Sequence, residues 1–175
     1  MPAGFSSSDQ TELIQSERDV QARIAGLGIE LDFASLAAVS NIFRAATVVR
    51  NHMERTVLAS TDLSFTAFTV LWVLWIWGEQ EARRVADESG ISRGTLTGVI
   101  GTLEARGLVQ RRPHPDDRRS VLMSTTAVGD ALMQGLYPQF NSEEAKVSAE
   151  LDQADKLALA DALRTVLRTV ESLDG

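Results

Sequence analysis

The chain contains no cysteine and only two histidines among its 175 residues. The absence of cysteine excludes disulfides, thiolate zinc sites, thiol nucleophiles and cysteine redox sensing. A zinc sensor would have to be built from histidine and carboxylate ligands, so we expect neither a metal nor another cofactor.

Sequence signals of an enzyme are also missing. No spacing of nucleophile and base stands out, and Gly94, Gly98 and Gly101 lie inside a predicted helix rather than in a loop between a strand and a helix. A phosphate-binding glycine fingerprint requires that loop. We therefore expect a protein that is not an enzyme.

The chain has no long hydrophobic run and no leader-like start. Its first residues, MPAGFSSSD, lack both the basic and the apolar region of a signal peptide. The most apolar stretch, residues 65–77, would span about 20 Å as a helix, whereas a bilayer core is about 30 Å thick. We expect a cytoplasmic protein, with no membrane contact, in which this stretch is a buried helix.

Positive charge is in short supply, with 17 basic against 24 acidic residues and a formal net charge of −7. An acidic surface repels phosphate, which argues at first sight against a nucleic-acid partner. Residues 83–119, however, hold eight arginines and five acidic residues, while the segments on both sides are acidic. Because the planar guanidinium suits phosphate and guanine edges, residues 83–119 are the candidate nucleic-acid-binding region.

Helical periodicity and capping residues are abundant. The sequence predicts helices over 9–25, 33–59, 65–77 after Ser64, 80–88, 93–105 after Ser92, 127–147 after Thr126, and from 153 onward after Asp152. Residues 108–112 and 118–124 flank a charged turn and indicate a β-hairpin. The predicted fold is mainly α with a small β-hairpin wing, a winged helix-turn-helix with further helices at both ends.

Residues 81–126 resemble the MarR family of bacterial transcriptional regulators. The resemblance rests on the segments ARRVADESGIS, SRGTLTGVIGTLEARGLVQRR and PDDRRSVLMSTTAVG, and on the helix order over about 33–172. Two places depart from the family pattern: Thr125-Thr126 replaces Leu-Thr, and glycines occupy positions 98 and 101. The resemblance implies one MarR-like domain over residues 1–175, with a DNA-binding lobe at 64–126 and dimerisation helices at 9–59 and 127–173.

The start of the helix at 93–105 is the first candidate for DNA contact, because a helix in the major groove presents its N-terminal residues to base edges. The candidates are Ser92, Arg93, Thr95, Leu96 and Thr97. The alternative is an ordinary capped surface helix.

The turn of the hairpin is the second candidate. Asp117 and Arg119 match the D-x-R motif of the resembled family, which implies that the arginine enters the minor groove and the aspartate braces it. We expect Arg118 to lie in the same groove, and Arg111, Arg112 and His114 to contact phosphate. The alternative is a solvated turn of mixed charges.

Apolar surface at both ends of the chain favours a homodimer. The last helix carries a seam at Leu159, Leu163, Val166, Val170 and Leu173, and residues 9–25 and 33–59 add apolar stripes. A two-fold dimer would bind a palindromic double-stranded operator with half-sites about one turn apart.

The resemblance also implies a small aromatic acid as effector, bound between the dimerisation helices and the DNA-binding lobe. The candidate ligand residues are Arg44, His52, Phe68, Trp72 and Trp75. The alternative is that the aromatics are core and that His52 is an interface histidine. We expect a ligand-released regulator of transcription, a repressor rather than an activator; the alternative is a protein-interaction module on the same scaffold without a ligand response.

Overall fold

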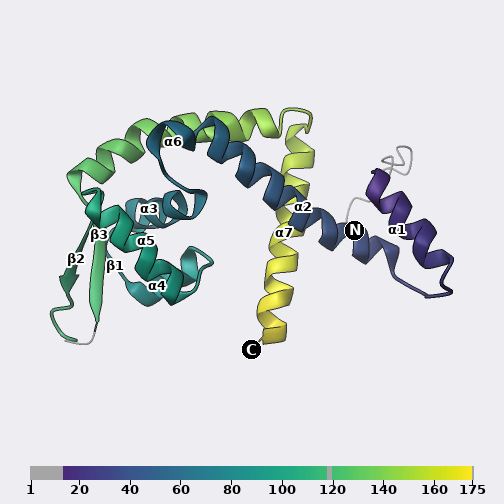
Figure 1. Cartoon of the computed structure of the whole chain (residues 1–175), viewed down its shortest axis with the longest axis horizontal. Helices are drawn as coiled ribbons and strands as arrows, with labels where there is room; N and C mark the ends of the chain where they lie inside the picture. The colour runs from purple at the N-terminus through teal and green to yellow at the C-terminus, as the bar shows by residue number, and fades with distance from the viewer. Residues whose placement is uncertain (1–13, 118–119, 175) are drawn as a thin grey trace. The chain divides into compact units, whose positions relative to one another are not determined.

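The computed structural model describes residues 14–117 and 120–174. They form two compact units, one ending at Val48 and the other beginning at Val49. Helices dominate both, and the strands are confined to a small sheet in the second unit (Figure 1). The mainly α fold with a small β wing is therefore confirmed.

The first unit consists of α1 (Gln15–Ala25) and the part of α2 (Phe33–Thr56) that ends at Val48. The Glu17 carboxylate accepts the backbone N–H of Ile14 at 3.0 Å at the start of α1, and Asp32 accepts that of Ser35 at 3.0 Å at the start of α2. Residues 9–13 of the predicted helix lie outside the described residues. No described residue of this unit is buried, so it has no core of its own.

The second unit starts with the end of α2 and a 3-10 turn, η1 (Leu58–Thr61), where the sequence predicts continuing helix. It continues with α3 (Phe65–Trp77), α4 (Ala82–Glu88), α5 (Arg93–Ala105), α6 (Ala127–Val147) and α7 (Gln153–Asp174). The predicted caps are confirmed: Ser64, Ser92 and Thr126 each accept a backbone N–H of the following helix at 3.1 Å. Such bonds satisfy N–H groups that have no partner within the helix.

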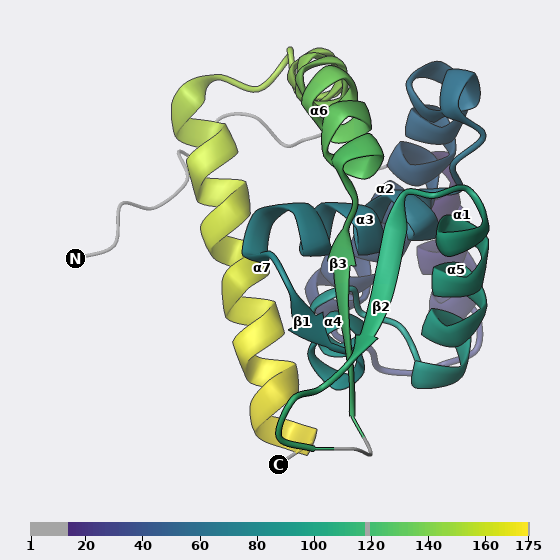
Figure 2. The ribbon, with the colours of Figure 1, turned by 90° about the vertical axis from the view of Figure 1, so that its left-hand side faces the viewer.

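Three short strands form an antiparallel sheet in the order β1-β3-β2. They are β1 (Gln80–Glu81), β2 (Val109–Pro113) and β3 (Val121–Thr125). Figure 2 shows β3 between its two neighbours. The predicted hairpin is confirmed, whereas the predicted helical start at residue 80 is wrong: Gly78, at φ +70°, redirects the chain after α3, and Gln80 pairs with Met123.

The core of the second unit is centred on α3, whose residues Ala67, Phe68, Val70, Leu71, Val73 and Leu74 are all buried. The sequence predicts a buried helix over residues 65–77, but its last two residues, Ile76 and Trp77, are exposed. The burial of α3 therefore ends before the helix does.

Gly129 allows α6 to start directly against the turn that follows α5. A Cβ at this position would lie 2.1 Å from the Leu108 carbonyl oxygen. The same turn is held by Thr126, whose backbone N–H donates to that oxygen at 3.0 Å and whose hydroxyl donates to the Gly107 carbonyl at 2.5 Å. These contacts fix α6, and with it the end of β3, on α5.

Two searches of the described ranges were negative. No helix in them is long and apolar enough to cross a membrane. Within the same ranges, no three histidine, aspartate or glutamate side chains come together as a group that could hold a metal ion.

Candidate nucleic-acid interface

The N-terminus of α5 presents short polar side chains and one arginine to solvent. The Ser92 hydroxyl caps the helix and shares a 2.9 Å hydrogen bond with the Thr95 hydroxyl, and the Thr97 hydroxyl donates to the Arg93 carbonyl at 3.0 Å. Arg93, Thr95 and Thr97 are exposed. In the part of the chain that the structure describes, the Arg93 guanidinium has no hydrogen-bond or ion-pair partner, so it is available to an external anion.

Leu96 does not belong to this exposed face. Its side chain is 1% exposed and lies in the hydrophobic core with Ile100 and Leu103. The predicted DNA contact of Leu96 is therefore wrong: the inward face of α5 repeats every three to four residues, and position 96 falls on it. Leu96 orients the helix instead.

Glycines line the exposed side of α5 at positions 94, 98 and 101. A Cβ built at Gly98 or Gly101 would meet no atom within 4 Å. Each glycine inside a helix costs about 1 kcal/mol relative to alanine. No atom of the described structure would collide with a side chain at position 98 or 101. Internal packing therefore does not explain why these two residues are glycines.

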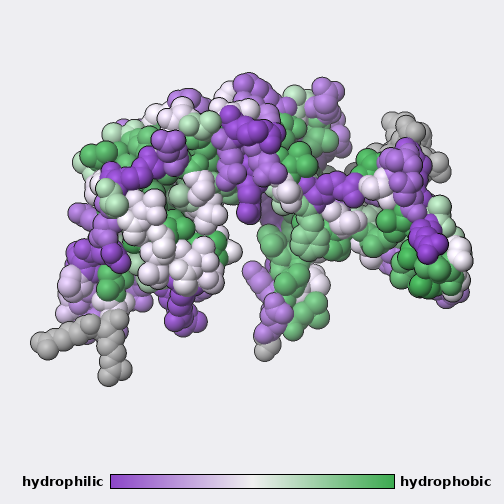
Figure 3. Space-filling model, viewed as in Figure 1, coloured by the Kyte–Doolittle hydropathy of each residue, from purple (hydrophilic) through white to green (hydrophobic). Residues whose placement is uncertain are grey.

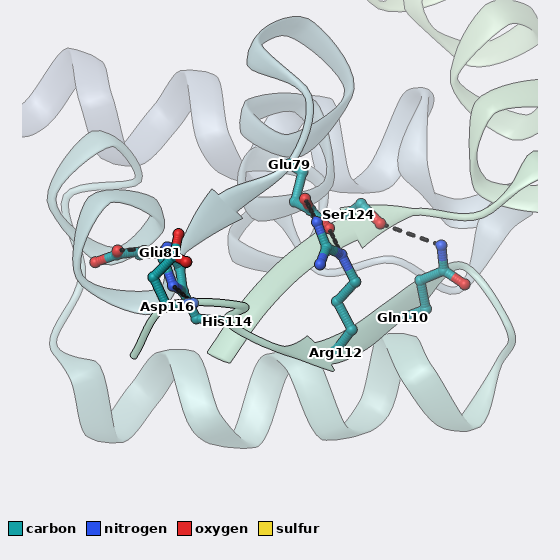
Figure 4. Close-up of polar contacts among 7 residues, drawn as sticks. All are labelled: Glu79, Glu81, Gln110, Arg112, His114, Asp116 and Ser124. Atoms are coloured by element: carbon teal, nitrogen blue, oxygen red, sulfur yellow. Dashed lines mark hydrogen bonds and ion pairs between the residues drawn. The ribbon is translucent and has the colours of Figure 1, made fainter. Parts of the chain in front are cut away.

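The two wing arginines predicted to contact phosphate are held by carboxylates. Arg111 pairs with Glu104 of α5, and Arg112 makes a two-pronged pair with Glu79, the residue before β1 (Figure 4). These hydrogen bonds lower the pKa of both glutamates and raise the pKa of both arginines. The pairs fasten β2 to α5 and to β1, so phosphate would have to compete with them.

His114 organises the turn of the wing. Its Nδ1 accepts the backbone N–H groups of Asp116 and Asp117, both at 3.1 Å, and its Nε2 lies 3.7 Å from a carboxylate oxygen of Glu81 (Figure 4). Because Nδ1 accepts, it carries no proton, and the ring proton sits on Nε2 facing Glu81. The histidine predicted to contact phosphate thus shapes the loop that carries the D-x-R motif.

The surface between α4, α5 and the wing is hollowed over about 400 Å³, and its charged lining includes Arg83, Arg93, Arg111 and Asp117. Arg118 and Arg119 lie outside the described residues. Arg84 on α4 is a further candidate that sequence reasoning did not name: it is exposed and has no partner among the described residues. Its position on the first helix of the helix-turn-helix, which crosses the DNA backbone in such folds, was a usable signal.

The five predicted ligand residues are divided between the two units. Arg44 belongs to the first unit, where it donates to the Ser16 hydroxyl at 2.5 Å and lines a cavity of about 330 Å³ between α1 and α2. His52 Nε2 lies 2.7 Å from a carboxylate oxygen of Glu143, whose other oxygen accepts from Lys146 at 2.7 Å. Both bonds lower the pKa of Glu143, the one from Lys146 more strongly.

Phe68 and Trp72 line a second cavity, of about 240 Å³, between α3 and α6. Trp75 lies beside it against Tyr137, with ring centroids 5.6 Å apart. Sequence reasoning missed the other wall residues, which are Phe65, Thr69, Tyr137, Phe140 and Glu144. The spacing of the last three on one helix face was a signal for them.

Comparison with known proteins agrees with the helix-turn-helix and wing described above. Residues 63–121, from just before α3 to the start of β3, match the profile of the MarR family. An HTH-type transcriptional regulator of Bacillus subtilis, YwaE, is 34% identical over 161 residues, which cover 91% of this chain and 94% of YwaE. This chain belongs to the MarR family.

Solved structures of MarR-type regulators share the fold. BpsR of Bordetella bronchiseptica, whose DNA binding is described as regulated by 6-hydroxynicotinic acid, is 27% identical, with a TM-score of 0.67 over 74% of this chain and 98% of BpsR. A point mutant of Escherichia coli MarR in complex with operator DNA is 19% identical, with a TM-score of 0.69 over 79% of this chain and 99% of that protein. The second likeness concerns the fold alone.

Proposed function

We propose that this protein is a dimeric, DNA-binding regulator of transcription that binds a palindromic operator through α5 and the wing. The observation that carries the proposal is the exposed face of α5. It combines an unpaired Arg93, the hydroxyls of Thr95 and Thr97, and glycines that no internal contact requires. Small side chains allow the helix backbone to approach base edges, and the arginine supplies a guanine or phosphate contact.

The other polar residues have separate roles in this proposal. Ser92 caps α5, and its hydroxyl lies at the end that enters the major groove. Arg119 enters the minor groove with Arg118 beside it, and Asp117 braces the tip, as the family motif implies. Arg111, Arg112 and His114 keep the wing in place. The two arginines contact phosphate only if they give up their ion pairs with Glu104 and Glu79.

Dimerisation is supported by apolar surface that the chain leaves exposed. Of the large hydrophobic residues that are exposed, nine lie between residues 14 and 48 and seven on α7. Figure 3 shows hydrophobic side chains gathered on both segments. The α7 seam includes Leu163 and Val166 at helical spacing, as expected for packing on another helix. A second copy of the chain would cover these faces.

A ligand response is supported by the relative BpsR, whose DNA binding a small aromatic compound regulates. A ligand shifts DNA affinity only if it binds one arrangement of the molecule more tightly than another. The α3–α6 cavity is the candidate site in this chain, because one of its walls is α3, which packs against both α4 and α5 of the helix-turn-helix. We assign repression rather than activation because occupation of a promoter is sufficient to block transcription.

The test is selection of bound DNA from a random library with the full chain, followed by binding measurements on the selected operator. Arg93→Ala and Arg119→Ala should each weaken specific binding by about 1–3 kcal/mol. Arg168→Ala on α7 is the matched control and should leave affinity unchanged. If no sequence is enriched, the protein-interaction alternative is favoured; if Arg119→Ala binds as tightly as the parent, the role assigned to the wing tip is wrong.

A further inference from the structure

We propose that the α3–α6 cavity binds a small arylalkylamine, which carries its amino group on a side chain of the ring, in its protonated, cationic form, and not an aromatic acid. This inference rests on the proposed ligand response and names the chemical class of the ligand. It departs from the aromatic acid that the family resemblance implies. Two features support it: the aromatic walls of the cavity and the charge of its lining.

Aromatic rings make up most of the walls. Phe68 of α3 and Phe140 of α6 are stacked, with ring centroids 4.2 Å apart and planes at 18°. Phe65 lies 6.4 and 6.3 Å from these two rings, and Trp72 and Tyr137 complete the aromatic lining. Ring faces carry partial negative charge and attract cations. One ring already does so, because the Arg50 guanidinium lies 5.3 Å from the centroid of Phe65.

The charged wall residue is an acid. Glu144 lines the cavity, and one of its carboxylate oxygens accepts from the Asn141 amide at 2.9 Å. No arginine, lysine or histidine belongs to the lining among the described residues. An organic anion would therefore face a carboxylate and the negative faces of aromatic rings, whereas a cation would be attracted by both.

Three basic groups of α2 and α6 are already engaged. Lys146 and His52 share the carboxylate of Glu143, and Arg50 lies over Phe65. On the α2 side, the Glu54 carboxylate accepts the backbone N–H of Phe65 at 2.7 Å and so caps α3. These pairings leave Glu144 as the charge that a ligand in the cavity meets.

The volume of the cavity limits the size of the ligand. At about 240 Å³ it lies just below the usual range of ligand sites. The expected ligand is thus an amine with a single ring.

The experiment compares three probes with the same phenol ring: tyramine, which is cationic, tyrosol, which is neutral, and 4-hydroxyphenylacetate, which is anionic. Each is titrated into the full-length protein by calorimetry. We expect tyramine to bind about tenfold more tightly than 4-hydroxyphenylacetate, with tyrosol between them. Glu144→Gln should remove most of the difference between tyramine and tyrosol. Glu150→Gln, an exposed carboxylate outside the cavity lining, is the control and should preserve it.

Equal or tighter binding of 4-hydroxyphenylacetate, or binding of none of the three probes, would overturn the inference. Circular dichroism on each variant confirms that the fold is intact. Operator binding without a ligand is measured on the same samples. Intact operator binding with no preference for tyramine removes this inference alone, whereas tyramine binding without operator binding removes the proposed function alone.

Discussion

The central segment, residues 53–140, and the terminal helices α1 and α7 have apolar residues at similar helical spacing, but they differ in how far these residues are buried. Every buried hydrophobic residue of the described chain lies between Met53 and Phe140, whereas α1 and α7 have no buried residue. An amphipathic pattern states that one face of a helix avoids water, but not which surface covers it. The central segment covers its own apolar faces, and we assign those of the terminal helices to a second copy.

The same substitution in both regions gives the strongest test of this comparison. Leu103→Asp places an unpaired carboxylate at a site that is 0% exposed and should unfold the central segment, because burying such a charge costs many kcal/mol. Leu163→Asp, at a site that is 37% exposed on α7, should leave the fold intact and convert the dimer to monomer. Circular dichroism reports the fold and analytical ultracentrifugation the mass; a monomeric parent protein would contradict the assignment of α7.

The second test contrasts two glycines of α6. Gly129→Ala should destabilise the protein by about 1–3 kcal/mol or more, because the new Cβ would collide with the Leu108 carbonyl. Gly135→Ala meets no atom within 4 Å and should stabilise the helix by up to about 1 kcal/mol. Thermal denaturation of both variants measures the difference. Equal melting temperatures would show that α6 does not start in close contact with α5.

The third test separates stability from DNA binding on α5. Gly98→Ala should raise stability by about 1 kcal/mol, since its Cβ would meet nothing within 4 Å. It should weaken operator binding about tenfold, because the added methyl group keeps the helix backbone from the bases. Denaturation and fluorescence anisotropy measure the two effects. A variant that is more stable and binds equally well would remove the glycines from the argument for DNA contact.

The smallest expected effect concerns the wing pairs. Arg112 lowers the pKa of Glu79, so the contribution of this pair to stability is complete above the ordinary glutamate pKa and is lost as the pH falls through the lowered value. The parent protein should therefore lose wing stability in acid and keep it near neutral pH. Glu79→Gln should flatten this dependence, and Glu88→Gln on α4 should not. Melting curves over a pH series test it, and identical profiles for parent and Glu79→Gln would exclude the contribution.

Local chemistry made much of the fold predictable. Hydroxyl caps at Ser64, Ser92 and Thr126 bond to backbone groups three residues ahead, so the boundaries of α3, α5 and α6 follow from neighbouring residues. The strand at Gln80 could not be predicted in this way. Gln80 pairs with Met123, which lies far along the chain. A strand of only two residues is also too short to show an alternating apolar pattern.

The candidate site, too, has features that follow from local sequence and features that depend on long-range contacts. The sequence alone determined the order of the α-helices and the hairpin, the position of the arginine-rich segment and the family, because these depend on residue type and spacing. Only the tertiary structure decided that Leu96 faces inward, that Glu104 and Glu79 hold Arg111 and Arg112, and that Glu144 and five aromatic residues line one cavity. These are contacts between segments far apart in the chain, and they exist only once the core has fixed where each helix lies.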